Sequence, residues 1–185
     1  MTHGFSNLTL ESERKTLLFS NHPEINLHLT DEHAQQTTLT ALAKLQNKIL
    51  VTEFIYTQCK TLCLTLGDYF QQAQTQISKN ELSSKIHLVS ISFDVAHDKP
   101  EQLQRYRHRM HADENIWSLA TLQTNADLNA AKETLGLIVL STQLKEFVHN
   151  SAFLVISNQG TLLGIYDEDD IQGALMLAKQ YSENL

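Results

Sequence analysis

The sequence predicts an α/β fold in which a central, mostly parallel sheet carries helices on both faces and ends in an antiparallel C-terminal hairpin. Three observations support this prediction. Short runs rich in β-branched and aromatic residues alternate with longer segments of helical periodicity. Two apolar runs near the C-terminus are separated by a short turn that contains Gly160. The length of 185 residues and the 42% of hydrophobic residues suit one domain with one core.

The N-terminal part carries the weakest pattern. We expect residues 1–20 to form a loose extension and residues 21–185 to form a single domain. The segments 17–19 and 25–29 are compatible with a short hairpin, and 37–45 is expected to be a loop or a short helix.

From residue 49 onward, strands and helices alternate. The predicted strands are 49–56, 86–93 and 116–120. The predicted helices are 61–78, a segment that begins at Pro100, 126–135 with Gly136 as its stop, and 169–181. The predicted hairpin joins 152–156 to 161–166 through a turn in which Gly160 supplies a positive φ. This order resembles a thioredoxin-like layout with an insertion, because alternating strands and helices build parallel sheets covered on both faces.

Charge and composition exclude several classes of protein. The chain has 14 Lys and Arg against 21 Asp and Glu, a net charge of −7. We therefore expect no nucleic-acid partner, because capture of phosphate requires a basic surface. Two cysteines exclude a multi-disulfide secreted scaffold. The sequence shows neither a signal-peptide pattern nor a run long enough to span a membrane, so we expect a cytoplasmic protein unless an export or anchor segment was removed.

The two cysteines, Cys59 and Cys63, lie just after the first predicted core strand, at the start of a predicted helix. Positions i and i+4 share a helix face and lie about 6 Å apart along the axis, which permits a disulfide or a shared metal ion. The positive end of a helix favours the thiolate, which is the form that binds metal or attacks a disulfide. The alternative interpretation is a pair of buried cysteines without chemistry.

Among nine histidines, His149 is the candidate third ligand. It is expected in the loop that enters the C-terminal hairpin, which in a thioredoxin-like sheet lies beside the start of the first helix. Its imidazole can therefore approach Cys59 and Cys63. Two thiolates and one imidazole form a soft ligand set that suits Cu(I), and a zinc site with an open position also fits. An ordinary histidine on a surface loop is the alternative.

One basic segment follows the second predicted strand. His108 and His111 flank a helix there together with Arg105, Arg107 and Arg109. We expect this segment to be a solvated helix face rather than a metal site.

Three segments resemble the Sco/SenC family of copper chaperones. Residues 54–63 resemble the strand and CxxxC segment of that family, and residues 92–100 resemble its D-x-x-x-D-x-P segment. His149 matches the metal-binding histidine that precedes the family's last hairpin. The family usually has proline at the positions of Lys60 and Leu64, so the chain is identified as a divergent member.

This resemblance implies a thioredoxin-like fold that binds one copper ion through Cys59, Cys63 and His149, with Cu(I) favoured and Cu(II) also permitted. It implies a chaperone that delivers copper for cytochrome c oxidase assembly to a copper-receiving protein, with oxidase subunit II as a candidate. It also implies a periplasmic location, or a membrane anchor that faces the periplasm, if an N-terminal signal or anchor was removed.

Three alternatives use the same residues differently. A thiol-disulfide oxidoreductase would use Cys59 and Cys63 as its catalytic pair, without metal, in exchange with a thiol-disulfide partner. A peroxiredoxin-like peroxidase would use Cys59 within Thr57-Gln58-Cys59, but no arginine is evident beside that segment. The last alternative is a thioredoxin-like interaction domain that has lost its chemistry.

Overall fold

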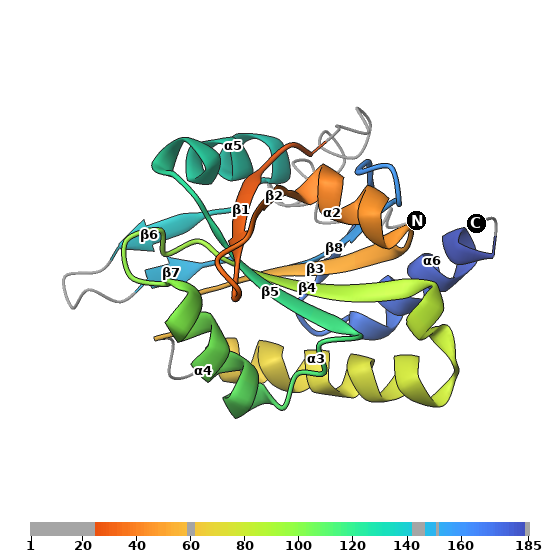
Figure 1. The fold of residues 1–185 in the computed structure, drawn as a ribbon. Helices are drawn as coiled ribbons and strands as arrows, with labels where there is room; N and C mark the ends of the chain where they lie inside the picture. Colours follow the sequence, from red (N-terminus) through yellow and green to blue (C-terminus); the bar gives the residue numbers. More distant parts are fainter. Residues whose placement is uncertain (1–24, 59–61, 142–146, 151, 184–185) are drawn as a thin grey trace, which may run out of the picture.

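The computed structural model describes residues 25–58, 62–141, 147–150 and 152–183 (Figure 1). These residues form a seven-stranded sheet in the order β2-β1-β5-β4-β3-β8-β9. Its strands are β1 (His28–Asp31), β2 (Gln36–Thr38), β3 (Ile49–Ile55), β4 (Ile86–Ser92), β5 (Trp117–Leu122), β8 (Ala152–Ile156) and β9 (Leu162–Asp167). The helices are α2 (Leu39–Gln46), α3 (Leu62–Lys79), α4 (Pro100–Met110), α5 (Asn125–Leu135) and α6 (Ile171–Ser182), with a short 3₁₀ turn at Leu82–Ser84.

The predicted α/β fold class is confirmed, but the sheet is mixed rather than mostly parallel. Parallel pairing is confined to the three central strands β3, β4 and β5. The strands β1 and β2 on one side and β8 and β9 on the other pair antiparallel. The C-terminal hairpin is confirmed, and Gly160 in its turn has the expected positive φ of 87°.

Helices cover both faces of the sheet, as predicted. Figure 1 shows α3 and α4 below the sheet and α5 above it. The helix α6 packs against β3, β8, β9 and α3. Phe70 packs α3 against the sheet. Its ring lies 5.3 Å from that of Trp117 in β5 and 5.7 Å from that of Phe153 in β8, measured between centroids.

The N-terminal hairpin differs from the prediction. The strand β1 covers His28–Asp31 rather than 25–29, and its hairpin partner is β2. The turn between them forms because the Asp31 carboxylate accepts hydrogen bonds from the backbone N–H groups of His33 and Gln35. The segment 17–19 and the expected extension 1–20 lie outside the described residues. Most of the segment 37–45 is a helix, as expected: residues 39–45 belong to α2, which the Thr38 hydroxyl caps, whereas Thr37 and Thr38 belong to β2.

The predicted solvated basic face is confirmed for Arg105, His108, Arg109 and His111, which are exposed, but not for Arg107. Only 8% of this residue is exposed, and its guanidinium pairs with the buried carboxylate of Glu32. It also donates to the backbone carbonyls of Ala112 and Trp117, at 2.8 and 2.9 Å. Burial raises the pKa of Glu32, and the Arg107 charge opposes that effect. The pair therefore fastens the turn between β1 and β2 to α4.

No helix in the described part of the chain combines the length and the apolar composition that crossing a bilayer requires.

Glu53 lies in the middle of β3 and is fully buried. The Ser90 hydroxyl donates to its Oε1 at 2.5 Å, whereas its Oε2 accepts no hydrogen bond from any described residue. Burial disfavours the charged carboxylate and raises the pKa of Glu53 from 4.5 to about 8.

We expect this carboxyl group to make folding stability fall with pH. Between pH 4.5 and about 8 the folded state keeps a proton that the unfolded state has released, so the free energy of unfolding declines by up to about 1.4 kcal/mol per pH unit. Glu53→Gln removes this contribution and should flatten the decline. Urea unfolding of both proteins from pH 5 to pH 8 measures the difference, and identical slopes would contradict the assignment.

Candidate functional site

Four aromatic rings gather at one edge of the sheet, where β3 and β4 end. Tyr56 directly follows β3 and Phe93 directly follows β4, while Phe147 and His149 come from β7 (Phe147–His149). The ring of His149 lies 5.0 Å from that of Phe93 and 6.0 Å from that of Tyr56 between centroids. Edge contacts of 5.2 and 5.5 Å join Phe147 to the same two rings. This aromatic cluster places His149 beside the residue from which the CxxxC segment leaves the sheet.

His149 lies at the end of a strand, and not in a loop as predicted. β7 pairs antiparallel with β6 (Val139–Ser141) in a separate two-stranded sheet, in which His149 lies opposite Val139. Three-residue strands are too short to show an alternating pattern in the sequence. The backbone pairing holds the histidine more firmly than a loop would.

The imidazole of His149 is almost fully buried, with 6% of the residue exposed. Its Nδ1 lies 3.0 Å from the Asn150 carbonyl oxygen. Because a carbonyl only accepts, Nδ1 carries the proton, and the lone pair of the neutral ring is on Nε2. Burial lowers the pKa of His149, against the opposing effects of the Asn150 carbonyl and Glu168. This neutral tautomer is the form that ligates a metal ion.

The two predicted thiolate ligands are described less completely. Cys59 lies outside the described residues. Cys63 is the second residue of α3, as the predicted helix requires, but its side chain is also outside the described part. Tyr56, which contacts His149, precedes Cys59 by three positions in the sequence. The convergence of Cys59, Cys63 and His149 therefore stays a prediction.

A buried carboxylate fixes the backbone just before the CxxxC segment. Asp98 is fully buried, and its Oδ2 accepts from the Thr57 backbone N–H at 2.7 Å and from the Ser92 hydroxyl at 2.5 Å. Its Oδ1 accepts from the Thr57 hydroxyl at 2.6 Å and from His97 Nδ1 at 3.1 Å. These four bonds satisfy a charge that would otherwise be costly to bury. They tie the end of β3 to the end of β4 and the loop before α4.

The same loop contains a group of metal-ligand types. Asp94, His97 and Asp98 each offer one ligand atom, and these atoms lie within 4.8 Å of one another. The Asp98 oxygens, however, are already occupied by its four donors. His97 donates from Nδ1 to Asp98, so its Nε2 accepts from the Gln58 amide at 2.6 Å. The group therefore acts as a structural brace.

Arg109 has a role that the sequence did not predict. Its guanidinium donates to the Thr57 carbonyl oxygen at 3.0 Å and lies 5.1 Å from the centroid of the Tyr106 ring. An arginine therefore lies beside the segment that leads to Cys59, contrary to the expectation that none does. No local pattern reveals this contact, because Thr57 and Arg109 are 52 positions apart.

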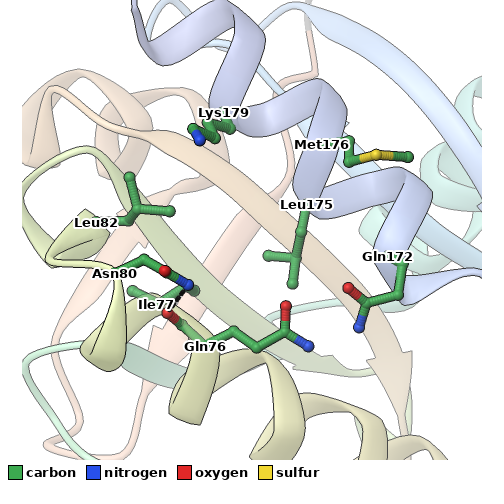
Figure 2. A pocket seen from close by; sticks show the side chains of 8 residues that line it. All are labelled: Gln76, Ile77, Asn80, Leu82, Gln172, Leu175, Met176 and Lys179. Atoms are coloured by element: carbon green, nitrogen blue, oxygen red, sulfur yellow. Dashed lines mark hydrogen bonds between the residues drawn. The ribbon is translucent and has the colours of Figure 1, made fainter.

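A pocket of about 160 Å³ lies between α3 and α6 (Figure 2). Leu175 projects from α6 toward α3, where Ile77 also lines the pocket, and Lys179 lies at its upper edge. Its α3 residues belong to the C-terminal end of that helix, whereas Cys63 is at the N-terminal end. This pocket is therefore not part of the candidate metal centre.

Comparison with known proteins identifies one family. The SCO1/SenC family profile matches residues 21–181. The SCO1 protein homolog of Bacillus subtilis is 21% identical over 129 residues, which cover 69% of this chain and 66% of that relative, slightly less than two thirds of its length.

Several solved structures share the fold. BsSco, described as a member of the Sco family of cytochrome c oxidase assembly proteins with a disulfide switch, has a TM-score of 0.73 at 18% identity, over 88% of this chain and 94% of that one. Arabidopsis thaliana ScoI with copper bound has a TM-score of 0.70 at 18% identity, over 84% and 98%. A SCO1/SenC family lipoprotein from Bacillus anthracis has a TM-score of 0.70 at 22% identity, over 84% and 96%. The predicted thioredoxin-like architecture of the Sco type is confirmed.

We expect Asp98→Asn to destabilise the fold by about 2–4 kcal/mol, because an amide directs an N–H₂ group at hydrogen-bond donors and leaves buried groups unsatisfied. Asp94→Asn is the matched control, since Oδ1 of this partly exposed carboxylate accepts one hydrogen bond of 3.2 Å, from the backbone N–H of His97. Denaturant unfolding of both variants measures the effect. Equal losses of stability would contradict a bracing role for Asp98.

Proposed function

Because this chain belongs to the SCO1/SenC family, we propose that it is a copper chaperone for cytochrome c oxidase assembly, with Cys59, Cys63 and His149 as its copper ligands. The observation that carries this proposal is the state of His149. Its neutral ring is buried in the aromatic cluster, with Nδ1–H held by Asn150 and the lone pair on Nε2. A hydrogen bond at one ring nitrogen fixes the tautomer and orientation of a metal-ligating imidazole.

The ligand set favours Cu(I) as the cargo, with Cu(II) also accommodated. Two thiolates and one imidazole are soft donors, and three donors leave room for an incoming ligand. Copper passes to the receiving protein by ligand exchange, in which each partner thiolate that bonds to the ion replaces a ligand of this chain. The copper keeps its oxidation state during this exchange. Oxidation of Cys59 and Cys63 to a disulfide would remove two electrons and both thiolate ligands, so copper affinity depends on the redox state.

The receiving partner in this proposal is a copper-binding protein of oxidase assembly, with oxidase subunit II as the candidate. We place the protein in the periplasm or on a membrane anchor that faces it. The likeness to a SCO1/SenC lipoprotein supports this location.

A thiol-disulfide oxidoreductase is the second candidate function. Arg109 favours it, because a guanidinium held at the Thr57 carbonyl favours thiolates in the segment that follows. In this case Cys59 and Cys63 would be oxidised to a disulfide as a partner disulfide is reduced to two thiols. His149 would then be dispensable.

Copper titration separates the two functions. We expect the reduced protein to bind one Cu(I) per chain and Cys59→Ser or Cys63→Ser to abolish tight binding, because each removes a thiolate ligand. His149→Ala should weaken the affinity by more than about tenfold, in line with the effect of disturbing even indirect partners of a metal site. The measurement is competition with a Cu(I) chelator under anaerobic conditions.

The matched control is His108→Ala, which removes an exposed imidazole from α4. It should leave the affinity unchanged. A His149→Ala variant that binds copper as tightly as the wild type, but still exchanges disulfides, would refute the chaperone and favour the oxidoreductase.

A further inference from the structure

A basic pocket of about 280 Å³ is lined in part by Thr57 and Gln58, which directly precede Cys59 in the sequence. The residues after β3, the loop after β4 and the helix α4 form its walls. The lining residues are Thr57, Gln58, His97, Gln102, Arg105, Tyr106 and Arg109. None of these is acidic, although the chain as a whole has a net charge of −7.

Two guanidinium groups dominate this pocket. Arg105 and Arg109 lie four residues apart on α4 and so share one helix face. Arg109 is held in place by the Thr57 carbonyl and the Tyr106 ring. Arg105 is exposed and makes no hydrogen bond or ion pair with any described residue. One cation is thus fixed in position, and the other is available to a ligand.

Among the other charged groups near the pocket, Glu101 lies four residues before Arg105 on α4, but it is exposed, does not line the pocket and makes no ion pair with any described residue. Asp98 is buried and does not line the pocket, and its carboxylate accepts hydrogen bonds from four donors. His97 uses both ring nitrogens within the protein, Nδ1 toward Asp98 and Nε2 toward the Gln58 amide. Gln102 also lines the pocket; its Oε1 accepts from the Lys99 backbone N–H, and its amide nitrogen makes no hydrogen bond with any described residue. Donors and positive charge therefore dominate the lining.

Carboxylates match this arrangement. A guanidinium binds a carboxylate through two parallel hydrogen bonds, and two arginines with an amide donor fit two neighbouring carboxylates. Such paired carboxylates occur where acidic residues lie close together in a polypeptide.

We propose that this basic pocket docks an acidic segment of the protein that receives copper, an inference that rests on the proposed function. Ligand exchange requires the partner surface to cover the metal site, and the pocket adjoins Thr57 and Gln58, which directly precede Cys59 in the sequence. An acidic partner is repelled by the net negative charge of the chain and attracted at this pocket. The pocket therefore sets the orientation in which the partner approaches.

The test uses a blocked hexaglutamate peptide as the probe and fluorescence anisotropy at low ionic strength as the readout. We expect Arg105→Gln to weaken peptide binding by about fivefold or more, because it removes a charge-assisted contact. Lys85→Gln, which removes an equal charge at an exposed position before β4, should change binding by less than about twofold. Absence of peptide binding to the wild type, or equal losses in the two variants, would overturn the proposal.

Inorganic phosphate distinguishes a small anion from a polypeptide. If phosphate binds the wild type as tightly as the peptide does, and this binding is lost in Arg105→Gln, the pocket binds a small anion and the docking proposal is overturned.

Cu(I) titration of Arg105→Gln keeps this test separate from the proposed function, since we expect the copper affinity of this variant to equal that of the wild type. If the wild type bound no copper, the proposed function would fail, and the docking of a copper-receiving partner would fail with it. Selective peptide binding would then still establish a carboxylate-binding pocket.

Discussion

The organisation of the site depends on one buried carboxylate. Asp98 brings together four donors from Thr57, Ser92 and His97, so the ends of β3 and β4 and the loop before α4 share a single anchoring charge. A buried carboxylate without such partners would cost several kcal/mol, and the surrounding backbone therefore has little freedom to rearrange. Thr57 is held by both its backbone and its hydroxyl. The segment that contains the two cysteines consequently starts from a fixed point.

A second group of contacts brings the histidine to the same edge of the sheet. His149 reaches Tyr56 and Phe93 from the separate two-stranded sheet of β6 and β7, which inserts before the C-terminal hairpin. The aromatic rings bury the imidazole and favour its neutral form, while Asn150 fixes its tautomer. Arg109 connects the site to the basic pocket, because its side chain donates a hydrogen bond to the Thr57 carbonyl oxygen and also lines that pocket. Ligand chemistry and partner recognition can thus be altered by different residues.

Much of this fold was predictable from the sequence, and the exceptions have physical reasons. The strands β3 and β4 are continuous apolar runs, and α3 and α4 show helical periodicity or a proline start, so local pattern and final structure agree. The strands β6 and β7 were missed because a strand of three residues is too short to show the alternation of apolar and polar residues that marks a strand in the sequence. Arg107 was assigned to a solvated face, and the contact of the exposed Arg109 with Thr57 was missed, because their partners, Glu32 and Thr57, are distant in the sequence. Cys59, Cys63 and His149 were proposed from spacing and resemblance, and of these the structure describes the side chain of His149 alone.

X-ray absorption at the copper edge of the Cu(I)-loaded protein tests the central claim most directly. The account predicts two sulfur donors and one nitrogen donor in the wild type, with the nitrogen contribution lost in His149→Ala and retained in His108→Ala. A spectrum without a nitrogen donor, or one that is identical in the wild type and His149→Ala, would show that the buried imidazole is not a ligand and would contradict the account.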